Sequence, residues 1–130
     1  MTQDEAGVVT KLSHRSVADT VAEFTSMIGA KGIRLFAVID QRAEARQAGL
    51  DLRDTTLVIF GSPVAGTPVM AASPLSALDL PLKILIWDDQ GQTKVSYYAP
   101  EALAARHHLS ERLTANLAAI NALTDALVAS

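Results

Sequence analysis

The chain has 130 residues, no cysteine and a net charge of −3, from 11 lysines and arginines against 14 aspartates and glutamates. The lack of cysteine excludes disulfides, a thiolate nucleophile and cysteine-ligated zinc or iron–sulfur sites, and the acidic balance argues against a nucleic-acid partner. No apolar run approaches the roughly 20 residues that cross a bilayer, and the polar start is unlike a secretory signal, so we expect one domain over residues 1–130, in the cytoplasm, with neither nucleic acid nor membrane as partner.

The first half of the chain predicts strands that alternate with helices. Ser16 is a candidate N-cap for an amphipathic helix that ends near Gly32. The third predicted strand is rich in β-branched residues and apolar on both faces, which indicates an interior strand covered on each side. The expected elements are a strand over 8–12, the helix over 17–28, a strand over 33–39, a short polar helix over 41–48 and a strand over 55–60.

The second half begins with a break in the pattern. Thr67 and Pro68 predict the N-cap and first turn of a short helix, which Pro74 stops near Ser73. The expected elements that follow are strands over 82–88 and 94–98 joined by a turn at 89–92, a short helix over 100–107, and a long C-terminal helix with an apolar stripe over 109–127. This order predicts an α+β fold with a single antiparallel sheet of about five strands, two long helices on one face and short helices in the connections.

The segment from Val64 to Leu80 is unusual because it connects two strands and is itself apolar. Such a segment has to be covered, either by a small hydrophobic ligand or by a second copy of the chain. Charged residues make up 19% of the chain, below the usual quarter, and this scarcity of polar surface favours an oligomer. We expect a homodimer.

The chain resembles the family of small bacterial and archaeal proteins known as domain of unknown function 302. The segments that carry the resemblance are Phe36–Asp40, Ala48–Arg53, Thr56–Pro63, Ala65–Met70, Leu78–Lys83 and Leu103–His107. The resemblance implies a sheet packed against helices with a topology like that of the TATA-binding protein, β-α-β(4)-α, and a dimer. It implies no reaction and no substrate.

Four positions depart from the common pattern of that family: Gln41, Asp54, Ser62 and His108. The family often has histidine after the aspartate of the second strand, where this chain has Gln41. A carboxylate beside an imidazole is an acid–base or metal-binding pair. If that pair carried a reaction in the family, this chain should lack the reaction.

The candidate ligand-binding residues are Asp40, Arg53, Phe60, Met70, Trp87, Tyr97 and His107. The aspartates lie at strand ends, where carboxylates commonly cap backbone N–H groups, and the methionine and aromatic residues are also ordinary core material. His107 and His108 are adjacent, so on a helix they point about 100° apart and cannot hold one ion together. The Gly61–Pro68 loop lacks the spacing and the lysine of a phosphate-binding loop. We expect no metal and no cofactor.

Three classes of function remain open. We favour a dimeric, non-enzymatic module in which the Val64–Leu80 segment closes over a small hydrophobic ligand or over the second subunit. An enzyme is the first alternative, and it requires Asp40, Arg53 and His107 to meet in one cleft. A protein-interaction module is the second, with the C-terminal helix or the open face of the sheet as the docking surface. The sequence does not decide whether the protein is an enzyme.

Overall fold

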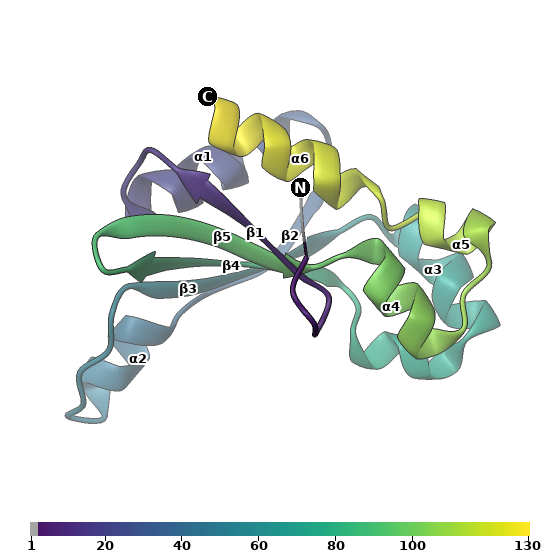
Figure 1. Cartoon of the computed structure of the whole chain (residues 1–130), viewed down its shortest axis with the longest axis horizontal. Coiled ribbons are helices and arrows are strands. Elements are labelled where there is room, and N and C mark those ends of the chain that lie inside the picture. The colour runs from purple at the N-terminus through teal and green to yellow at the C-terminus, as the bar shows by residue number, and fades with distance from the viewer. Residues whose placement is uncertain (1–2) are drawn as a thin grey trace.

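Five antiparallel strands form one sheet in the order β1-β5-β4-β3-β2 (Figure 1). A computed structural model describes residues 3–130; the first two residues of the polar start lie outside the described part. The strands are β1 (Val8–Ser13), β2 (Arg34–Asp40), β3 (Thr55–Gly61), β4 (Leu82–Asp89) and β5 (Gln92–Tyr98). The helices are α1 (Val17–Ala30), α2 (Gln41–Gln47), α3 (Pro63–Ala72), the 3₁₀ helix η1 (Pro74–Leu78), α4 (Pro100–His107), α5 (Glu111–Ala115) and α6 (Ala119–Ala129). The predicted α+β class is confirmed.

The main core lies between the sheet and the two helices α1 and α6, which cover the same face (Figure 1). As predicted, the Ser16 side chain caps α1 by accepting a hydrogen bond from the backbone N–H of Asp19 (3.1 Å). Phe24 of α1 packs edge to face on Phe60 of β3, with 4.9 Å between ring centroids. The fully buried side chains of this core are Phe24, Ile28, Val58, Phe60, Ile84, Ile86, Val95, Ile120 and Leu127.

A two-residue turn joins β4 to β5. Asp89 pairs with Gln92, and between them Gln90 and Gly91 both have positive φ, 53° and 92°. Positive φ at both central residues is the conformation that matches the twist of a tight hairpin. The turn predicted over 89–92 is therefore confirmed, with Gly91 in a backbone conformation that glycine adopts without strain.

A buried lysine ties β1 to α6. The Lys11 ammonium donates hydrogen bonds to the Asn121 carbonyl (3.1 Å) and the Thr124 hydroxyl (2.6 Å). It also lies 2.8 Å from the Asp125 carboxylate and 5.2 Å from the centre of the Tyr97 ring. With its charge paired and its hydrogen bonds made, this ammonium can lie inside the helix layer.

Two predicted helices have different bounds in the structure. α3 starts at Pro63, which occupies the first turn after Ser62, and it continues through Pro68 to Ala72. Thr67 is therefore inside the helix and does not cap it. Proline fits the first turn, where the backbone N–H has no intrahelical partner, so the earlier proline sets the start.

The apolar stripe over 109–127 does not form one long helix. It divides into α5 and α6, with i→i+3 hydrogen bonds at Asn116, Leu117 and Ala118 between them. Leu113 and Leu117 pack on a second, smaller cluster beside α3, whereas the stripe on α6 packs on the main core. Figure 1 shows α5 and α6 as separate helices, and the bend between them lets one sequence stripe serve two separate apolar clusters.

The third strand is interior, as predicted, but its two faces differ. Val58 and Phe60 are buried under the helices, whereas Leu57 and Ile59 on the opposite face are only half-buried. The expected cover on both faces is wrong, because α1 and α6 lie on the same side of the sheet (Figure 1).

Candidate functional site

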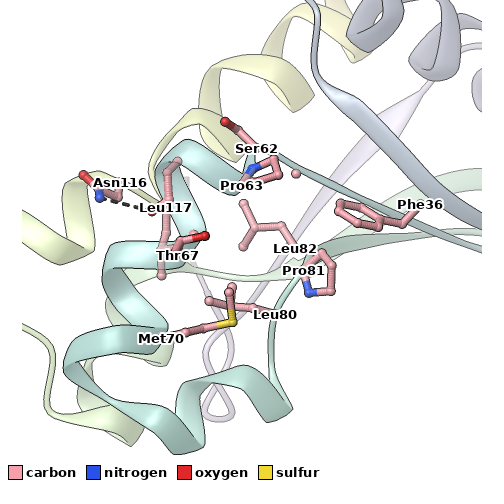
Figure 2. A pocket seen from close by; sticks show the side chains of 13 residues that line it. Phe36, Ser62, Pro63, Thr67, Met70, Leu80, Pro81, Leu82, Asn116 and Leu117 are labelled. Atoms are coloured by element: carbon pink, nitrogen blue, oxygen red, sulfur yellow. Dashed lines mark hydrogen bonds between the residues drawn. The ribbon is translucent and has the colours of Figure 1, made fainter.

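An apolar cavity of about 210 Å³ lies where the ends of β3 and β4 meet the helices α3 and α5. Figure 2 shows its wall, with Met70 of α3 on one side and Phe36 of β2 on the other. The lining residues are Phe36, Gly61, Ser62, Pro63, Ala65, Gly66, Thr67, Met70, Leu80, Pro81, Leu82, Asn116 and Leu117. We refer to α3, η1, α4 and α5 together as the cavity lobe.

Small residues on one side of α3 leave this space open. A side chain at Gly66 would first meet the terminal methyl of Met70, at 3.9 Å from its Cβ, which is ordinary contact. Ala65 adds only a methyl group to the same part of the wall. The cavity therefore follows from residue size on α3, because a larger residue at either position would occupy part of it.

The cavity is nearly free of polar chemistry. None of its lining residues is ionisable within the described part of the chain. The Thr67 hydroxyl points toward the centre of the cavity in Figure 2. The side-chain N–H₂ group of Asn116 already donates a hydrogen bond to the Ala65 carbonyl (3.1 Å). Such a wall favours a neutral, mostly apolar molecule that offers one polar group to the hydroxyl.

Side-chain hydrogen bonds to Asp79, which follows η1, connect parts of the cavity lobe. Its carboxylate accepts hydrogen bonds from the His107 imidazole (2.6 Å) and the Arg106 guanidinium (3.0 Å), both at the end of α4. Partial burial would raise the pKa of Asp79, but these hydrogen bonds and the adjacent positive charges lower it below the ordinary value. Burial also lowers the pKa of Lys83, against the opposing effect of Asp79.

The apolar segment Val64–Leu80 is covered only in part by its own chain. Val69 is fully buried in the second cluster with Leu103 and Leu117. In contrast, Val64, Leu75 and Leu78 are 86%, 71% and 80% exposed. The surface of the cavity lobe therefore keeps large apolar side chains in contact with solvent.

Of the seven candidate residues predicted from the sequence, Met70 lines the cavity and the other six lie outside its wall. Phe60 and Tyr97 belong to the main core, where the Tyr97 hydroxyl donates to Asn121 (2.8 Å). Trp87 lies on the open face of the sheet and donates from its indole N–H to Ser96 (3.0 Å). His107 is tied to Asp79 in the cavity lobe.

The remaining two candidates lie at the far end of the strands. Asp40 caps α2 by accepting a hydrogen bond from the backbone of Ala43 (2.9 Å), and Arg53 precedes β3, 4.0 Å from Asp89 at the hairpin. His107 contacts the loop before β4, where Leu82 pairs with the last part of β3. The structure therefore does not bring Asp40, Arg53 and His107 into one cleft, which the enzyme hypothesis requires.

Most of the cavity wall is missed by sequence reasoning. Phe36, Asn116 and Leu117 come from β2 and the α5–α6 bend, and nothing in their local pattern marks them as neighbours of α3. A signal does exist at Gly66, because a glycine inside a helix costs stability relative to alanine and commonly has a packing or functional reason.

Two further observations concern metals and membranes. Across residues 3–130, no group of three or more histidine, aspartate or glutamate side chains is arranged to hold a metal ion. None of the helices in that range combines the length and apolarity needed to span a bilayer.

Comparisons with known proteins agree with the sequence resemblance. A family profile described as "Domain of unknown function DUF302" matches residues 8–127. A solved structure, the "uncharacterized conserved protein DUF302 from Bacillus stearothermophilus", has the same fold, with a TM-score of 0.79, 17% sequence identity, and 94% of this chain and 95% of that one covered.

Curated relatives carry a different name. Two proteins named "Fluoride-specific ion channel FluC 1", from Brucella suis biovar 1 (strain 1330) and Brucella abortus biovar 1 (strain 9-941), are each 38% identical over 106 residues. The similarity covers 81% of this chain but only 42% and 39% of those proteins. The chain thus spans about two fifths of the length of the curated relatives it matches.

Proposed function

From the premise that the chain belongs to the DUF302 family, we propose that it is a non-enzymatic binding module whose cavity takes one small, neutral, mostly apolar molecule. The observation that carries the proposal is the wall of the cavity, which is apolar, without an ionisable residue, and open at about 210 Å³. A concave apolar site with one hydrogen-bonding side chain on its wall is the usual form of a small-molecule site, so a space of this shape and polarity points to a ligand.

The volume limits the size of the ligand. Drug-sized ligands occupy pockets of roughly 300–1,000 Å³, whereas a buried apolar cavity of about 150 Å³ holds a benzene molecule. A cavity of about 210 Å³ lies nearer the second case. The expected ligand is a single aromatic ring or a short branched chain.

The polarity of the wall limits the charge of the ligand. A carboxylate or an ammonium would lose its hydration inside this cavity without gaining a counter-charge, which costs far more than any contact there returns. The Thr67 hydroxyl offers one hydrogen bond to a ligand hydroxyl or carbonyl (Figure 2). Benzyl alcohol is therefore expected to bind better than benzoate, although the two are nearly equal in size.

The test compares these two compounds by ligand-observed NMR and by thermal shift. Benzyl alcohol and toluene should stabilise the protein in proportion to their occupancy, and benzoate should not. Gly66→Leu fills the cavity and should abolish the effect, whereas the control Gly29→Leu, on α1 with nothing within 4 Å of its Cβ, should leave it unchanged.

Met70→Ala provides a second and independent variant for the same test. It enlarges the cavity on the side of α3, and it should extend binding to two-ring compounds such as indole. Equal responses to benzyl alcohol and benzoate, or a response that survives Gly66→Leu, would contradict the proposal.

A second candidate function follows from the curated relatives. Because proteins named as fluoride-specific channels contain a part 38% identical to this chain, the fold is a candidate companion domain of an ion channel. Sodium fluoride should then shift the melting temperature more than sodium chloride at equal ionic strength. The uncharged cavity predicts no such difference, so the salt comparison separates the two candidates.

The expected homodimer requires a surface other than the interior of the cavity. The expected cytoplasmic location stays a prediction from the sequence.

A further inference from the structure

The two sides of the cavity wall are supported in different ways. α3 forms one side, with the backbone hydrogen bonds of a helix. Leu80 and Pro81 form part of the other side (Figure 2). These two residues belong to residues 79–81, which join η1 to β4 and are in neither a helix nor a strand. We refer to residues 79–81 as the wall segment, and its backbone groups need partners other than those of a helix or a ladder.

Lys83 of β4 supplies two of these partners. Its ammonium donates hydrogen bonds to the Asp79 carbonyl (3.3 Å) and to the Pro81 carbonyl (3.1 Å), so it fixes the backbone on both sides of Leu80. A lysine side chain normally extends so that its charge stays in water. Here burial lowers the pKa of Lys83, and the negative charge of Asp79 opposes that shift. The ammonium is therefore held against the wall segment.

The Asp79 carboxylate connects the same segment to α4. It accepts hydrogen bonds from the His107 imidazole (2.6 Å) and the Arg106 guanidinium (3.0 Å). An ionised carboxylate can only accept, so Nε2 of His107 donates to it whether the ring is neutral or charged. The Arg106 guanidinium also lies 5.2 Å from the centre of the Tyr98 ring of β5. The charged and titratable groups that face Asp79 thus come from α4 (His107 and Arg106) and from β4 (Lys83).

Asp79 and Lys83 do not line the cavity, although Leu80 between them does. We propose that these two residues position the wall of the cavity, so that their charges regulate its affinity for an uncharged ligand that touches neither of them. When either charge is lost, the wall segment spends less time in the position that completes the cavity. The apparent affinity then falls with the fraction of molecules that keep this position. This regulation rests on the proposed function, because it concerns the ligand of the same cavity.

The pH dependence of binding gives the sign of this regulation. Benzyl alcohol stays uncharged in neutral and alkaline solution, so a change in its affinity comes from the protein. The pKa of Lys83 is below its ordinary value of 10.5, and the side chain donates weaker hydrogen bonds once the pH rises through that lowered value. The pKa of Asp79 is below 3.8, so this carboxylate stays ionised in the same range. The affinity should therefore be constant near neutral pH and fall on the alkaline side.

The experiment measures the dissociation constant of benzyl alcohol by ligand-observed NMR between about pH 6 and about pH 10. Lys83→Met should weaken binding about tenfold at neutral pH, the effect of losing a hydrogen bond to a charged group, and it should show no further alkaline decline. Lys83→Arg should restore the affinity without the alkaline decline, because arginine stays charged. The matched control is Lys94→Met on β5, which removes an ammonium that pairs with Asp89 (2.6 Å) and should bind as the wild type does.

A second measurement needs no ligand. Hydrogen exchange of the free protein should be faster at the amides of Leu80 and Leu82 in Lys83→Met, and unchanged at Val69 in α3, because only the wall segment loses its support. Asp79→Asn should change binding and exchange in the same direction, since it weakens the hydrogen bonds to α4. This variant keeps the test decisive if Lys83→Met folds poorly.

The positioning role and the proposed function fail separately. If benzyl alcohol does not bind to the wild type, the proposed function is overturned, and faster exchange at Leu80 in Lys83→Met still supports the positioning role. If benzyl alcohol binds, equal affinity or unchanged exchange in Lys83→Met overturns the positioning role. An equal loss of affinity in Lys94→Met overturns it too, and so does a failure of Lys83→Arg to restore binding, because the charge would then not set the wall.

Discussion

The main core and the cavity lobe are built in different ways. Under α1 and α6, large side chains such as Phe24, Ile28 and Ile84 have no exposed surface and fill the space between helices and sheet. At the cavity lobe, the buried cluster consists of Val69, Leu103 and, from the α5–α6 bend, Leu117, and it lies beside about 210 Å³ of open space.

The cavity lobe depends instead on side-chain hydrogen bonds between its elements. Asp79 links the end of η1 to the end of α4 through His107 and Arg106, and the Ser73 hydroxyl donates to the His107 carbonyl (3.3 Å). A region fixed by a few hydrogen bonds around a small core opens more readily than one fixed by close packing. A binding cavity is expected in such a region, since a ligand has to enter it.

The largest expected effect is in the main core. Phe24→Ala removes the ring that packs on Phe60, and it should lower the free energy of unfolding by about 3–5 kcal/mol. Met70→Ala in the cavity wall should cost about 1 kcal/mol, because a half-buried side chain beside open space loses fewer contacts. Urea denaturation of both variants checks the contrast, and equal losses would remove the distinction between the regions.

The next largest effect is expected at the hydrogen bonds that Asp79 accepts from His107 and Arg106. Asp79→Asn should lower the stability by about 1–3 kcal/mol at pH 7, because it weakens charge-assisted hydrogen bonds to His107 and Arg106. The pKa of Asp79 is below its ordinary value of 3.8 in the folded chain. Its contribution is therefore complete above the unfolded pKa and is lost as the pH falls through the folded pKa.

The stabilities of the wild type and Asp79→Asn should accordingly converge as the solution is acidified below about pH 4. Urea titrations at pH 7, 5 and 3 measure the convergence. Asp125→Asn serves as a control, since it removes a carboxylate from the other region, beside Lys11. A difference for Asp79→Asn that stays constant with pH would show that the carboxylate charge does not matter there.

A smaller effect of opposite sign is expected at Gly66. Gly66→Ala should raise the stability by about 0.5–1 kcal/mol, because alanine favours the helix over glycine and the new methyl meets only Met70 at 3.9 Å. Thermal denaturation checks it against Gly29→Ala on α1, which should gain a similar amount. A gain at Gly29 with a loss at Gly66 would mean that the cavity does not tolerate the methyl.

The smallest effect is expected on the exposed surface of the cavity lobe. Leu75→Ser/Leu78→Ser should change the free energy of unfolding by less than about 0.5 kcal/mol, because surface residues away from packing contacts contribute little. Both leucines are more than 70% exposed. A large loss in denaturation experiments would instead show that these side chains are covered in solution.

Local chemistry made much of the fold predictable. Ser16 before an amphipathic run, Pro100 at a helix start and Gly91 in a tight hairpin each fix the backbone within a few residues, and each lies where it was predicted. The split of the 109–127 stripe was not predictable, because its spacing is compatible with one helix and only the position of Val69 and the main core requires two.

The candidate site was predictable as a segment, because Val64–Leu80 contributes five of the lining residues, but among the seven named candidates it was predictable only at Met70. Met70 could be proposed because methionine suits adaptable apolar walls. Phe36 and Asn116 could not, because they lie 34 residues before Met70 and 46 residues after Met70 along the chain and reach the cavity only through the fold. Likewise, Asp79 and His107 are 28 residues apart, and only the packing of η1 on α4 makes them partners.

The sequence by itself determined the strands, most of the helices and the family of the chain. The strands and helices follow from side-chain periodicity, capping and turn chemistry, which act over a few residues, whereas the family follows from the resemblance of six segments along the chain. Only the tertiary structure decided where space remains open and which strands form the edges of the sheet. A cavity is the volume left between elements far apart in the chain, and an edge is defined by strand order, so both depend on how the finished elements pack together.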